Sequence, residues 1–298
     1  MNEAVCPAFA ESQSLVSKLV WEAHTGIREG KILKPKLVWL ELSACSGNII
    51  SLLDGVDPGF KYLLEQMTDV LFDNSLMSAE GEEAMEQLFG APPGFILAVE
   101  GAVSTASDGK YNIIGRLGGE EISGYRAVLE LGERASYVIA VGACASHGGV
   151  SAAVPNLGEC VGVHSVLSRH VINLPGCPCH PDWFMGTLAH ILLFGEPELD
   201  GRGRPLLFYG DTIHDRCQRR SFFDNGIFAE KLGDPECMFK LGCRGPITRA
   251  DCPVRKWNEY VNWPVGNSTP CIGCAQFGFP DAMEPFINYD TVRGGKNG

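Results

Sequence analysis

The sequence predicts an α/β protein with an open, doubly wound parallel sheet, followed by an irregular C-terminal domain. Between residues 35 and 200, apolar runs of strand length alternate with segments whose apolar residues recur at helical spacing. The runs are continuously apolar, which is typical of strands covered on both faces. Beyond about residue 200 this pattern fades, and cysteine, proline, glycine and arginine become frequent.

Five short apolar runs are the expected strands: 36–42, 95–100, 137–141, 171–174 and 206–209. Helical spacing is found between them in four segments: 60–71, 79–89, 124–135 and 183–193. We therefore expect each strand to be joined to the next by a helix that crosses over one face of the sheet.

Residues 1–34 differ in pattern from the rest. Apolar residues recur there at helical spacing: Leu15, Val16, Leu19, Val20 and Ala23. We expect an amphipathic helix that either packs on its own domain or serves as a docking arm. Three domains follow: an N-terminal helical extension (1–34), a sheet domain (35–200) and a C-terminal domain (201–298).

Composition excludes several classes of protein. The net charge of −12 argues against nucleic-acid binding, which needs a basic surface. No apolar stretch is long enough to cross a bilayer. The first basic residue after the N-terminus is Lys18, and no apolar run of signal length follows a basic patch. We expect a cytoplasmic location, with attachment to a membrane only through a partner.

The cysteines carry most of the functional information. Nine of the twelve fall into three groups, and a chain expected to stay in a reducing compartment uses such thiols for metal rather than for disulfides. The densest run combines one histidine with six cysteines: His214, Cys217, Cys237, Cys243, Cys252, Cys271 and Cys274. The three cysteines outside these groups, Cys6, Cys160 and Cys179, are expected to be ordinary thiols.

Three further cysteines follow predicted strands. Cys45 comes after the first strand, Cys144 after the third and Cys177 after the fourth. Ligands of open parallel sheets bind beyond the carboxyl ends of the strands, so these distant residues are expected at one edge of one sheet. Nearby glycines let the backbone approach a bulky inorganic group. The sequence thus predicts a metal cluster at this edge.

A series of motifs resembles the small subunit of NiFe hydrogenases. The motifs cover residues 36–285 in this order: WLELSACSG, AVEGA, GACASHGG, NLPGCPCHPDW, IHDRCQRRSFFDNGIFAE, GCRGP, ADCP, VNWPV and PCIGCAQFGFPD. They are highly specific in combination, and the CSGN variant is most similar to the uptake branch of cyanobacteria and actinobacteria. The resemblance implies a flavodoxin-like sheet domain and a C-terminal domain that binds iron–sulfur clusters.

For the proximal cluster the resemblance implies the ligands Cys45, Cys144 and Cys177. The family's usual fourth cysteine is replaced by Asn48, whose amide is a weak ligand for cluster iron. A 3Fe-4S cluster, a 4Fe-4S cluster with oxygen ligation, or recruitment of Cys179 are the possible outcomes. We favour ligation by three cysteines.

Two more clusters are implied for the C-terminal domain. The distal cluster, 4Fe-4S or 3Fe-4S, would be bound by a histidine and three cysteines: His214, Cys217, Cys237 and Cys243. The medial cluster would be bound by Cys252, Cys271 and Cys274, with Pro264 at the place of a fourth ligand. Because proline has no side-chain donor, a 3Fe-4S species is expected.

The function implied by this resemblance is electron transfer within a hydrogenase. Hydrogen is split at a NiFe centre in a separate large subunit, and this chain holds no catalytic residue. Electrons would pass from the proximal to the medial and the distal cluster, and then to an acceptor such as a quinone or a redox protein. Heterodimers of the two subunits are expected to assemble further. High cluster potentials would favour hydrogen oxidation.

Other readings of the same residues remain. A hydrogen-sensing small subunit would keep the fold and the clusters, but it usually retains the cysteine that Asn48 replaces. A structural zinc or scaffold protein could bind zinc through the C-terminal cysteines, although a zinc ribbon needs none at the sheet edge. Arg216, Arg219 and Arg220 flank the distal motif. They could stabilise a reduced cluster, meet an acidic partner or form a solvated basic patch.

Overall fold

The computed structural model describes the backbone of residues 7–56 and 59–280, and within these ranges the side chains from Leu15 onward. It divides into two compact units: Val16–Pro205, and Met1–Leu15 with Leu206–Gly298. Each unit is described by itself. Within the described residues, no helix combines the length and the apolar character that a bilayer span requires.

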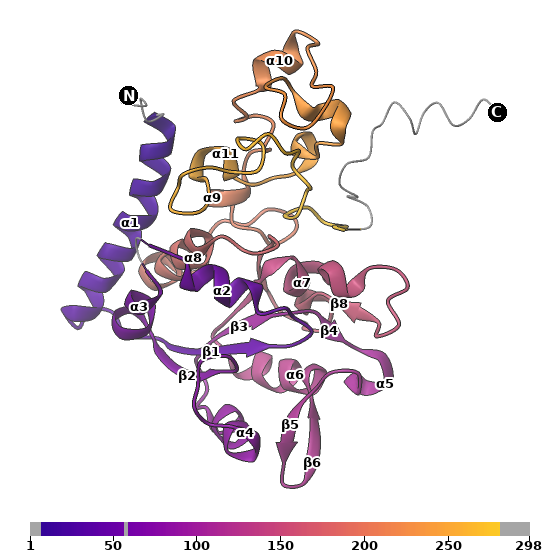
Figure 1. The fold of residues 1–298 in the computed structure, drawn as a ribbon. Coiled ribbons are helices and arrows are strands. Elements are labelled where there is room, and N and C mark those ends of the chain that lie inside the picture. The colour runs from indigo at the N-terminus through magenta and orange to yellow at the C-terminus, as the bar shows by residue number, and fades with distance from the viewer. Residues whose placement is uncertain (1–6, 57–58, 281–298) are drawn as a thin grey trace. The chain divides into compact units, whose positions relative to one another are not determined.

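The larger unit is built on a parallel sheet of five strands in the order β2–β1–β3–β7–β9 (Figure 1). The strands are β1 (Lys36–Glu41), β2 (Asp69–Asp73), β3 (Ile96–Glu100), β7 (Tyr137–Val141) and β9 (Ile172–Leu174). Counting only these parallel strands, the order is 2-1-3-4-5, which is that of flavodoxin-like doubly wound sheets. The predicted fold class is therefore confirmed.

Helices cover both faces of this sheet, as Figure 1 shows. Alternate residues of β1, such as Val38 and Leu40, belong to a buried core with α4 (Gly81–Gly90) and α6 (Gly124–Arg134). On the other face, the ring of Trp39 packs edge-on against Phe184 of α8 (Pro181–Phe194), with 5.1 Å between ring centroids. The short helix α7 (Gly142–His147) begins directly beyond β7, and α2 (Gly47–Leu53) follows β1 after a short loop.

The helix predicted for 60–71 is only partly correct. The chain forms α3 (Phe60–Tyr62) and one π turn (Leu63–Met67), and then β2 pairs with β1 as the edge strand, with Asp69 opposite Lys36. A short apolar run satisfies either period, so tertiary pairing decides its structure.

The strand predicted at 206–209 is wrong, because these residues form the helical turn α9 (Leu206–Tyr209). It begins directly after Pro205, a residue that favours helix starts. Phe208 and Tyr209 are buried, so the apolar run reflects burial and not strand structure.

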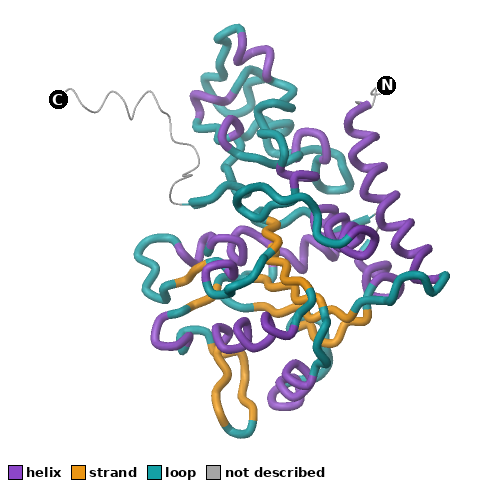
Figure 2. Tube along the Cα trace, turned by 180° about the vertical axis from the view of Figure 1, so that it is seen from behind, coloured by secondary structure: helices purple, strands orange, loops and turns teal. Residues whose placement is uncertain are grey.

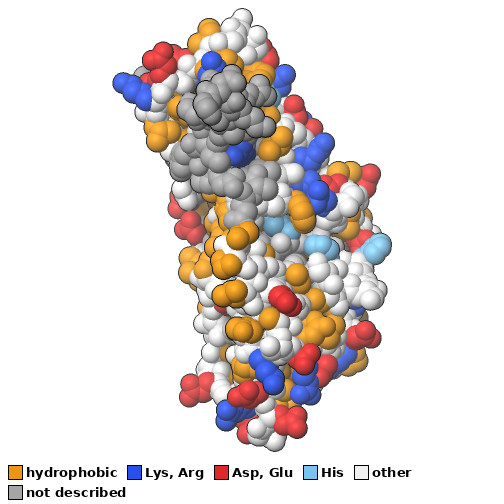
Figure 3. All heavy atoms as spheres, turned by 90° about the vertical axis from the view of Figure 1, so that its right-hand side faces the viewer, with side chains coloured by type: hydrophobic (Ala, Val, Ile, Leu, Met, Phe, Trp, Pro, Cys, Tyr) orange, Lys and Arg blue, Asp and Glu red, His pale blue; other side chains and the backbone are white. Residues whose placement is uncertain are grey.

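Two antiparallel pairs were not predicted. The hairpin of β5 (Ile113–Leu117) and β6 (Glu120–Ser123) turns at Gly118 and Gly119, which both have positive φ, as a two-residue hairpin loop requires. In Figure 3, acidic and basic side chains are interspersed at the bottom of the view, and Figure 1 draws this hairpin at the same height. The second pair joins β4 (Val103–Ser104) to β8 (Cys160–Val161).

The predicted N-terminal helix is present as α1 (Pro7–Arg28). Within the larger unit four of its apolar residues are buried, Val16, Leu19, Val20 and Ala23, whereas Trp21 is exposed. The ring of His24 also packs on Tyr62 of α3, with 5.0 Å between ring centroids. These contacts are those of a helix that packs on its own unit.

The smaller unit consists of single helical turns joined by long loops (Figure 2). Its described turns include α10 (Arg220–Asp224), two 3-10 turns (Met238–Leu241 and Gly245–Ile247) and α11 (Cys252–Arg255). Arg255 is 2% exposed, and its guanidinium donates to Asp251 Oδ2 at 2.7 and 2.9 Å and lies over the ring of Phe208. Buried apolar side chains such as Phe208, Met238 and Trp263 accompany this polar contact in the smaller unit.

Candidate metal centres

The first candidate centre lies at the carboxyl edge of the sheet, in the larger unit. Cys45 follows β1, Cys144 lies in α7 directly after β7, and Cys177 follows β9. Burial, with smaller contributions from Glu100 and Cys177, raises the pKa of Cys144 to about 11. Burial also raises the pKa of Cys177, and Cys45 adds to this rise. The three thiols therefore lie within electrostatic range of their neighbours, as their positions at strand ends predict.

Glu100, the last residue of β3, organises this edge. Its side chain is fully buried and accepts three hydrogen bonds. Oε1 accepts from Asn48 N at 2.9 Å and from Asn48 Nδ2 at 3.1 Å, and Oε2 accepts from Ile49 N at 3.0 Å. The carboxylate thus caps the first turn of α2. No role for Glu100 was predicted from the sequence. A charged residue at the end of an apolar strand nevertheless indicates a buried carboxylate that needs specific partners.

Asn48 is 5% exposed, and both ends of its amide are used. Oδ1 accepts from Cys179 N at 2.8 Å, while Nδ2 donates to Glu100 and lies 3.9 Å from Cys144 Sγ. A Cβ at Gly142, whose φ is +88°, would lie 2.5 Å from Asn48 Nδ2, so only glycine fits beside this amide. The buried Cys179 thiol donates to His180 O at 3.5 Å.

The second candidate centre lies in the smaller unit. A small cavity of about 20 Å³ is lined by all four residues predicted for one cluster: His214, Cys217, Cys237 and Cys243. Burial, helped by Arg220, lowers the pKa of His214, which favours the neutral imidazole that binds metal. The His214 ring also packs edge-on against Phe223, with 4.4 Å between ring centroids. The histidine is therefore held in position by neighbouring side chains.

The third group of cysteines lies in the same unit. Cys252 opens α11 and, like Cys271, is less than a tenth exposed. Burial raises the pKa of both thiols, and Cys274 raises them further by Coulomb repulsion. Pro264 lies in an exposed turn beside Val265, which lines the cavity of the second centre. The pKa of Cys271 is also raised by Cys243.

These donor sets fit groups larger than one ion. Within residues 7–56 and 59–280, no three His, Cys, Asp or Glu side chains converge closely enough to bind a single metal ion. A zinc site would need four ligands at about 2.0–2.3 Å from one point. In a cuboidal cluster each iron takes its own ligand, so the ligands stand further apart. Burial also makes it costly to deprotonate this many thiols. A positively charged group bound among them, such as cluster iron, lowers that free-energy cost.

A larger cavity is unrelated to the predicted site residues. It has a volume of about 730 Å³ and lies along the open edge strand β2 and the segments that flank it. No cysteine or histidine lines it, and its walls combine apolar side chains with carboxylates such as Asp69 and Asp73. The cysteine-lined sites are therefore the better functional candidates.

Two family models match this sequence. Residues 209–287 match the C-terminal model of the NiFe/NiFeSe hydrogenase small subunit. Residues 45–191 match the model of the NADH ubiquinone oxidoreductase 20 kDa subunit. The two matches divide the chain between the sheet unit and the smaller unit.

Characterised relatives span most of the chain. It is 38% identical to the periplasmic [NiFeSe] hydrogenase small subunit of Desulfomicrobium baculatum, over 85% of this chain and 87% of the relative. Identity to the quinone-reactive Ni/Fe-hydrogenase small chain of Wolinella succinogenes is 34%, over 84% and 73% of the two chains.

Solved structures agree with the sequence relatives. A [NiFeSe] hydrogenase chain from Desulfomicrobium baculatum superposes with a TM-score of 0.81 at 38% identity, over 85% of this chain and 98% of that one. An actinobacterial-type NiFe hydrogenase from Ralstonia eutropha H16 gives 0.80 at 27% identity, over 86% and 83%. The second of these fits the branch that the CSGN motif suggested.

The expectation of a cytoplasmic location is contradicted by these relatives. The small subunits from Desulfomicrobium baculatum, Solidesulfovibrio fructosivorans and Nitratidesulfovibrio vulgaris are all named periplasmic. The expectation rested on finding no export pattern in the given sequence, which does not determine where the protein is located.

Proposed function

Since this chain belongs to the family of NiFe hydrogenase small subunits, we propose that it conducts electrons through three iron–sulfur clusters. It pairs with the large subunit that carries the NiFe centre, where hydrogen is split. The single observation that supports this role best is the cavity lined by His214, Cys217, Cys237 and Cys243. Soft ligands that meet around one space in a fold of this family suit a cluster better than any organic ligand.

The three sites receive their ligands as follows. The proximal cluster is bound by Cys45, Cys144 and Cys177, and the medial cluster by Cys252, Cys271 and Cys274. The distal cluster is bound by His214, Cys217, Cys237 and Cys243. Burial is the main cause of the raised thiol pKa values, and neighbouring thiols add to it: Cys45 raises the pKa of Cys177, and Cys237 and Cys243 raise that of Cys217. The pKa of Cys271 is raised by Cys274 of its own set and also by Cys243 of the distal set, so these two sets lie near each other.

The proximal cluster is proposed to have three protein ligands and three irons. Asn48 is an unsuitable fourth ligand, because its oxygen already accepts from Cys179 N and its nitrogen donates to Glu100. Cys179 is unsuitable as well, since its thiol points to the carbonyl oxygen of His180. The Asn48 amide instead connects the loops that follow β1 and β9.

The protein's own contribution is to hold, bury and separate these centres. When bound, the clusters accept and release single electrons. Glu100 fixes the start of α2 and thereby the loop that carries Cys45. Phe223 restrains the ring of His214. Burial of Cys252 and Cys271 keeps water from the site of the medial cluster. Exclusion of water is one of the means by which a protein sets the reduction potential of a cluster.

The clusters of the complex can be counted directly. We expect iron and labile sulfide for three clusters in the purified complex of both subunits. Electron paramagnetic resonance at low temperature should distinguish 3Fe-4S signals of the proximal and medial centres from the distal centre. A colourless complex, or iron that suffices for one cluster alone, would contradict the proposed function.

The working direction is proposed to be hydrogen uptake, with a quinone or a redox protein as the acceptor. Clusters with three irons tend to have high potentials, which favours oxidation of hydrogen over its evolution. The quinone-reactive relative from Wolinella succinogenes supports such an acceptor. Film voltammetry of the complex should give a large oxidation current and little proton reduction. Efficient proton reduction near the thermodynamic potential would refute the direction.

A further inference from the structure

Arg219 is a buried cation at the wall of the distal centre. It is 6% exposed and lines the same cavity as His214, Cys217, Cys237 and Cys243. Its backbone N–H also donates to Cys217 Sγ at 3.4 Å. A guanidinium keeps its charge at every physiological pH, so a full positive charge is held beside the proposed ligands.

The hydrogen bonds of this guanidinium go to neutral oxygens. Nη1 donates to Asp234 O at 2.7 Å and to Glu236 O at 2.8 Å, and Nη2 donates to Ser268 Oγ at 2.8 Å. In the part of the chain that the structure describes, Arg219 forms no ion pair with a carboxylate. Its hydrogen bonds are thus satisfied while its charge has no anionic partner in the protein.

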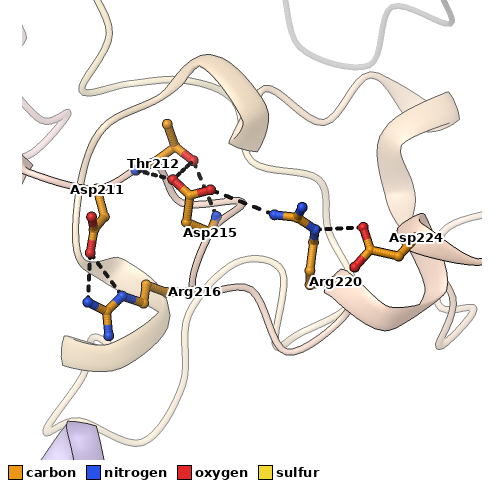
Figure 4. A network of polar contacts seen from close by, with 6 residues as sticks. All are labelled: Asp211, Thr212, Asp215, Arg216, Arg220 and Asp224. Atoms are coloured by element: carbon orange, nitrogen blue, oxygen red, sulfur yellow. Dashed lines mark hydrogen bonds and ion pairs between the residues drawn. The ribbon is translucent and has the colours of Figure 1, made fainter.

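The two neighbouring arginines, Arg216 and Arg220, both pair with carboxylates, as Figure 4 shows. Arg216 is exposed and pairs with Asp211 Oδ2 at 2.8 Å. Arg220 is partly exposed and bridges Asp215 at 3.6 Å and Asp224 at 2.8 Å. Their charges are balanced by carboxylates and screened by water. Of these three arginines, only Arg219 is buried with its charge unbalanced.

Burying an unpaired charge is costly, and the cost falls when an opposite charge enters the same site. A cluster bound by thiolates becomes more negative when it is reduced, and interaction with a fixed cation favours that state. We propose that Arg219 is a positioning residue that raises the reduction potential of the distal cluster and so sets where electrons collect before they leave. This inference rests on the proposed function, because it requires a cluster at this site.

The test compares two variants of the holo complex with both subunits. Arg219→Gln keeps hydrogen-bonding atoms and removes the charge, whereas Arg219→Lys keeps the charge and loses the planar fork. In redox titrations followed by electron paramagnetic resonance, Arg219→Gln should lower the reduction equilibrium constant of the distal cluster about tenfold, which is about 59 mV for one electron. Arg219→Lys should change it less than threefold.

Two controls separate charge from structure. Arg216→Gln removes an exposed, paired charge near the same motif and should leave the potential unchanged. Ser268→Ala removes one acceptor of the buried guanidinium without touching its charge and should also leave the potential unchanged. Because Arg219 is buried, the shift in Arg219→Gln should persist at about 1 M salt, where exposed charges are screened.

Each outcome decides the inference. An unchanged potential in Arg219→Gln overturns it, and so does an equal shift in both Arg219 variants. If Arg219→Gln fails to bind the distal cluster, iron content decides. A normal iron content in Arg219→Lys then supports the need for a positive charge at this position. An equal loss of iron in both Arg219 variants overturns the inference. If the unaltered complex has no distal cluster, the proposed function itself fails, which the iron count of that complex reveals separately.

Discussion

Replacing Glu100 with alanine is expected to loosen the proximal site and the start of α2 by about 3–5 kcal/mol. The fully buried carboxylate accepts from the backbone N–H groups of Asn48 and Ile49 and from the Asn48 amide. Without it, these donors are left unsatisfied away from water, at about 1–3 kcal/mol for each buried group. The proximal cluster should be lost or altered, because the loop of Cys45 leads directly into these residues.

The loss can be measured as amide hydrogen exchange in the complex. Exchange in the peptide that covers residues 46–53 should become about 100-fold faster or more, since about 1.4 kcal/mol corresponds to a factor of ten. Burial raises the pKa of Glu100, so folding disfavours its charged form. Glu100→Gln keeps one oxygen acceptor and should therefore cost only about 1 kcal/mol.

Glu41 supplies the matched control. It is paired with Glu100 in the sheet register and also ends its strand, but its side chain accepts from the hydroxyl groups of Ser46 and Ser75. It is only half-buried, so Glu41→Gln should change exchange in the same peptide less than tenfold. Equal exchange in Glu100→Ala and the unaltered complex would show that the carboxylate does not hold this edge.

Replacing Asn48 with cysteine is expected to convert the proximal centre from three irons to four. Asn48 Nδ2 lies 3.9 Å from Cys144 Sγ, so a thiolate at this position would lie close to one of the three proposed ligands. Cysteine is smaller than asparagine and fits beside Gly142, where space is tight. Loss of the amide bonds to Glu100 and Cys179 N costs about 1–3 kcal/mol, which a fourth iron–sulfur bond offsets.

Mössbauer spectra and iron content measure the conversion. Asn48→Ala removes the same hydrogen bonds without adding a thiolate, so it should keep the three-iron signal if the chain still loads. An iron count in Asn48→Cys that equals the unaltered complex, with an unchanged resonance signal, would argue against three-cysteine ligation. In that case another group already completes the proximal cluster.

The sheet could be predicted because its strands are distinctive. The runs at 95–100 and 137–141 are almost entirely apolar and are each followed by a glycine, and they correspond to β3 and β7 with small differences at their ends. The placement of Cys45, Cys144 and Cys177 at one edge followed from topology alone. The segment 60–71, predicted as one helix, forms α3, a π turn and the start of β2, and the run 206–209, predicted as a strand, forms a helical turn. Short apolar runs of this kind suit either structure, so their burial does not decide between them.

The smaller unit could not be predicted in the same way. The turns around His214 and Cys217 have no periodicity, and only the motif series indicated that Cys237 and Cys243 belong with them. The partners of Arg219 include the backbone oxygens of Asp234 and Glu236, and backbone groups carry no signature in a sequence. The three arginines therefore looked equivalent until their partners were visible.

The exposure of two sheet-edge cysteines bears on how the complex must be assembled. Cys45 and Cys177 are open to solvent in this chain, while Cys144 is half-buried. An inorganic group held there would meet dissolved oxidants across an unshielded rim as long as the chain stood alone. A partner subunit that covered this edge would therefore shield an inorganic group bound there from oxidation.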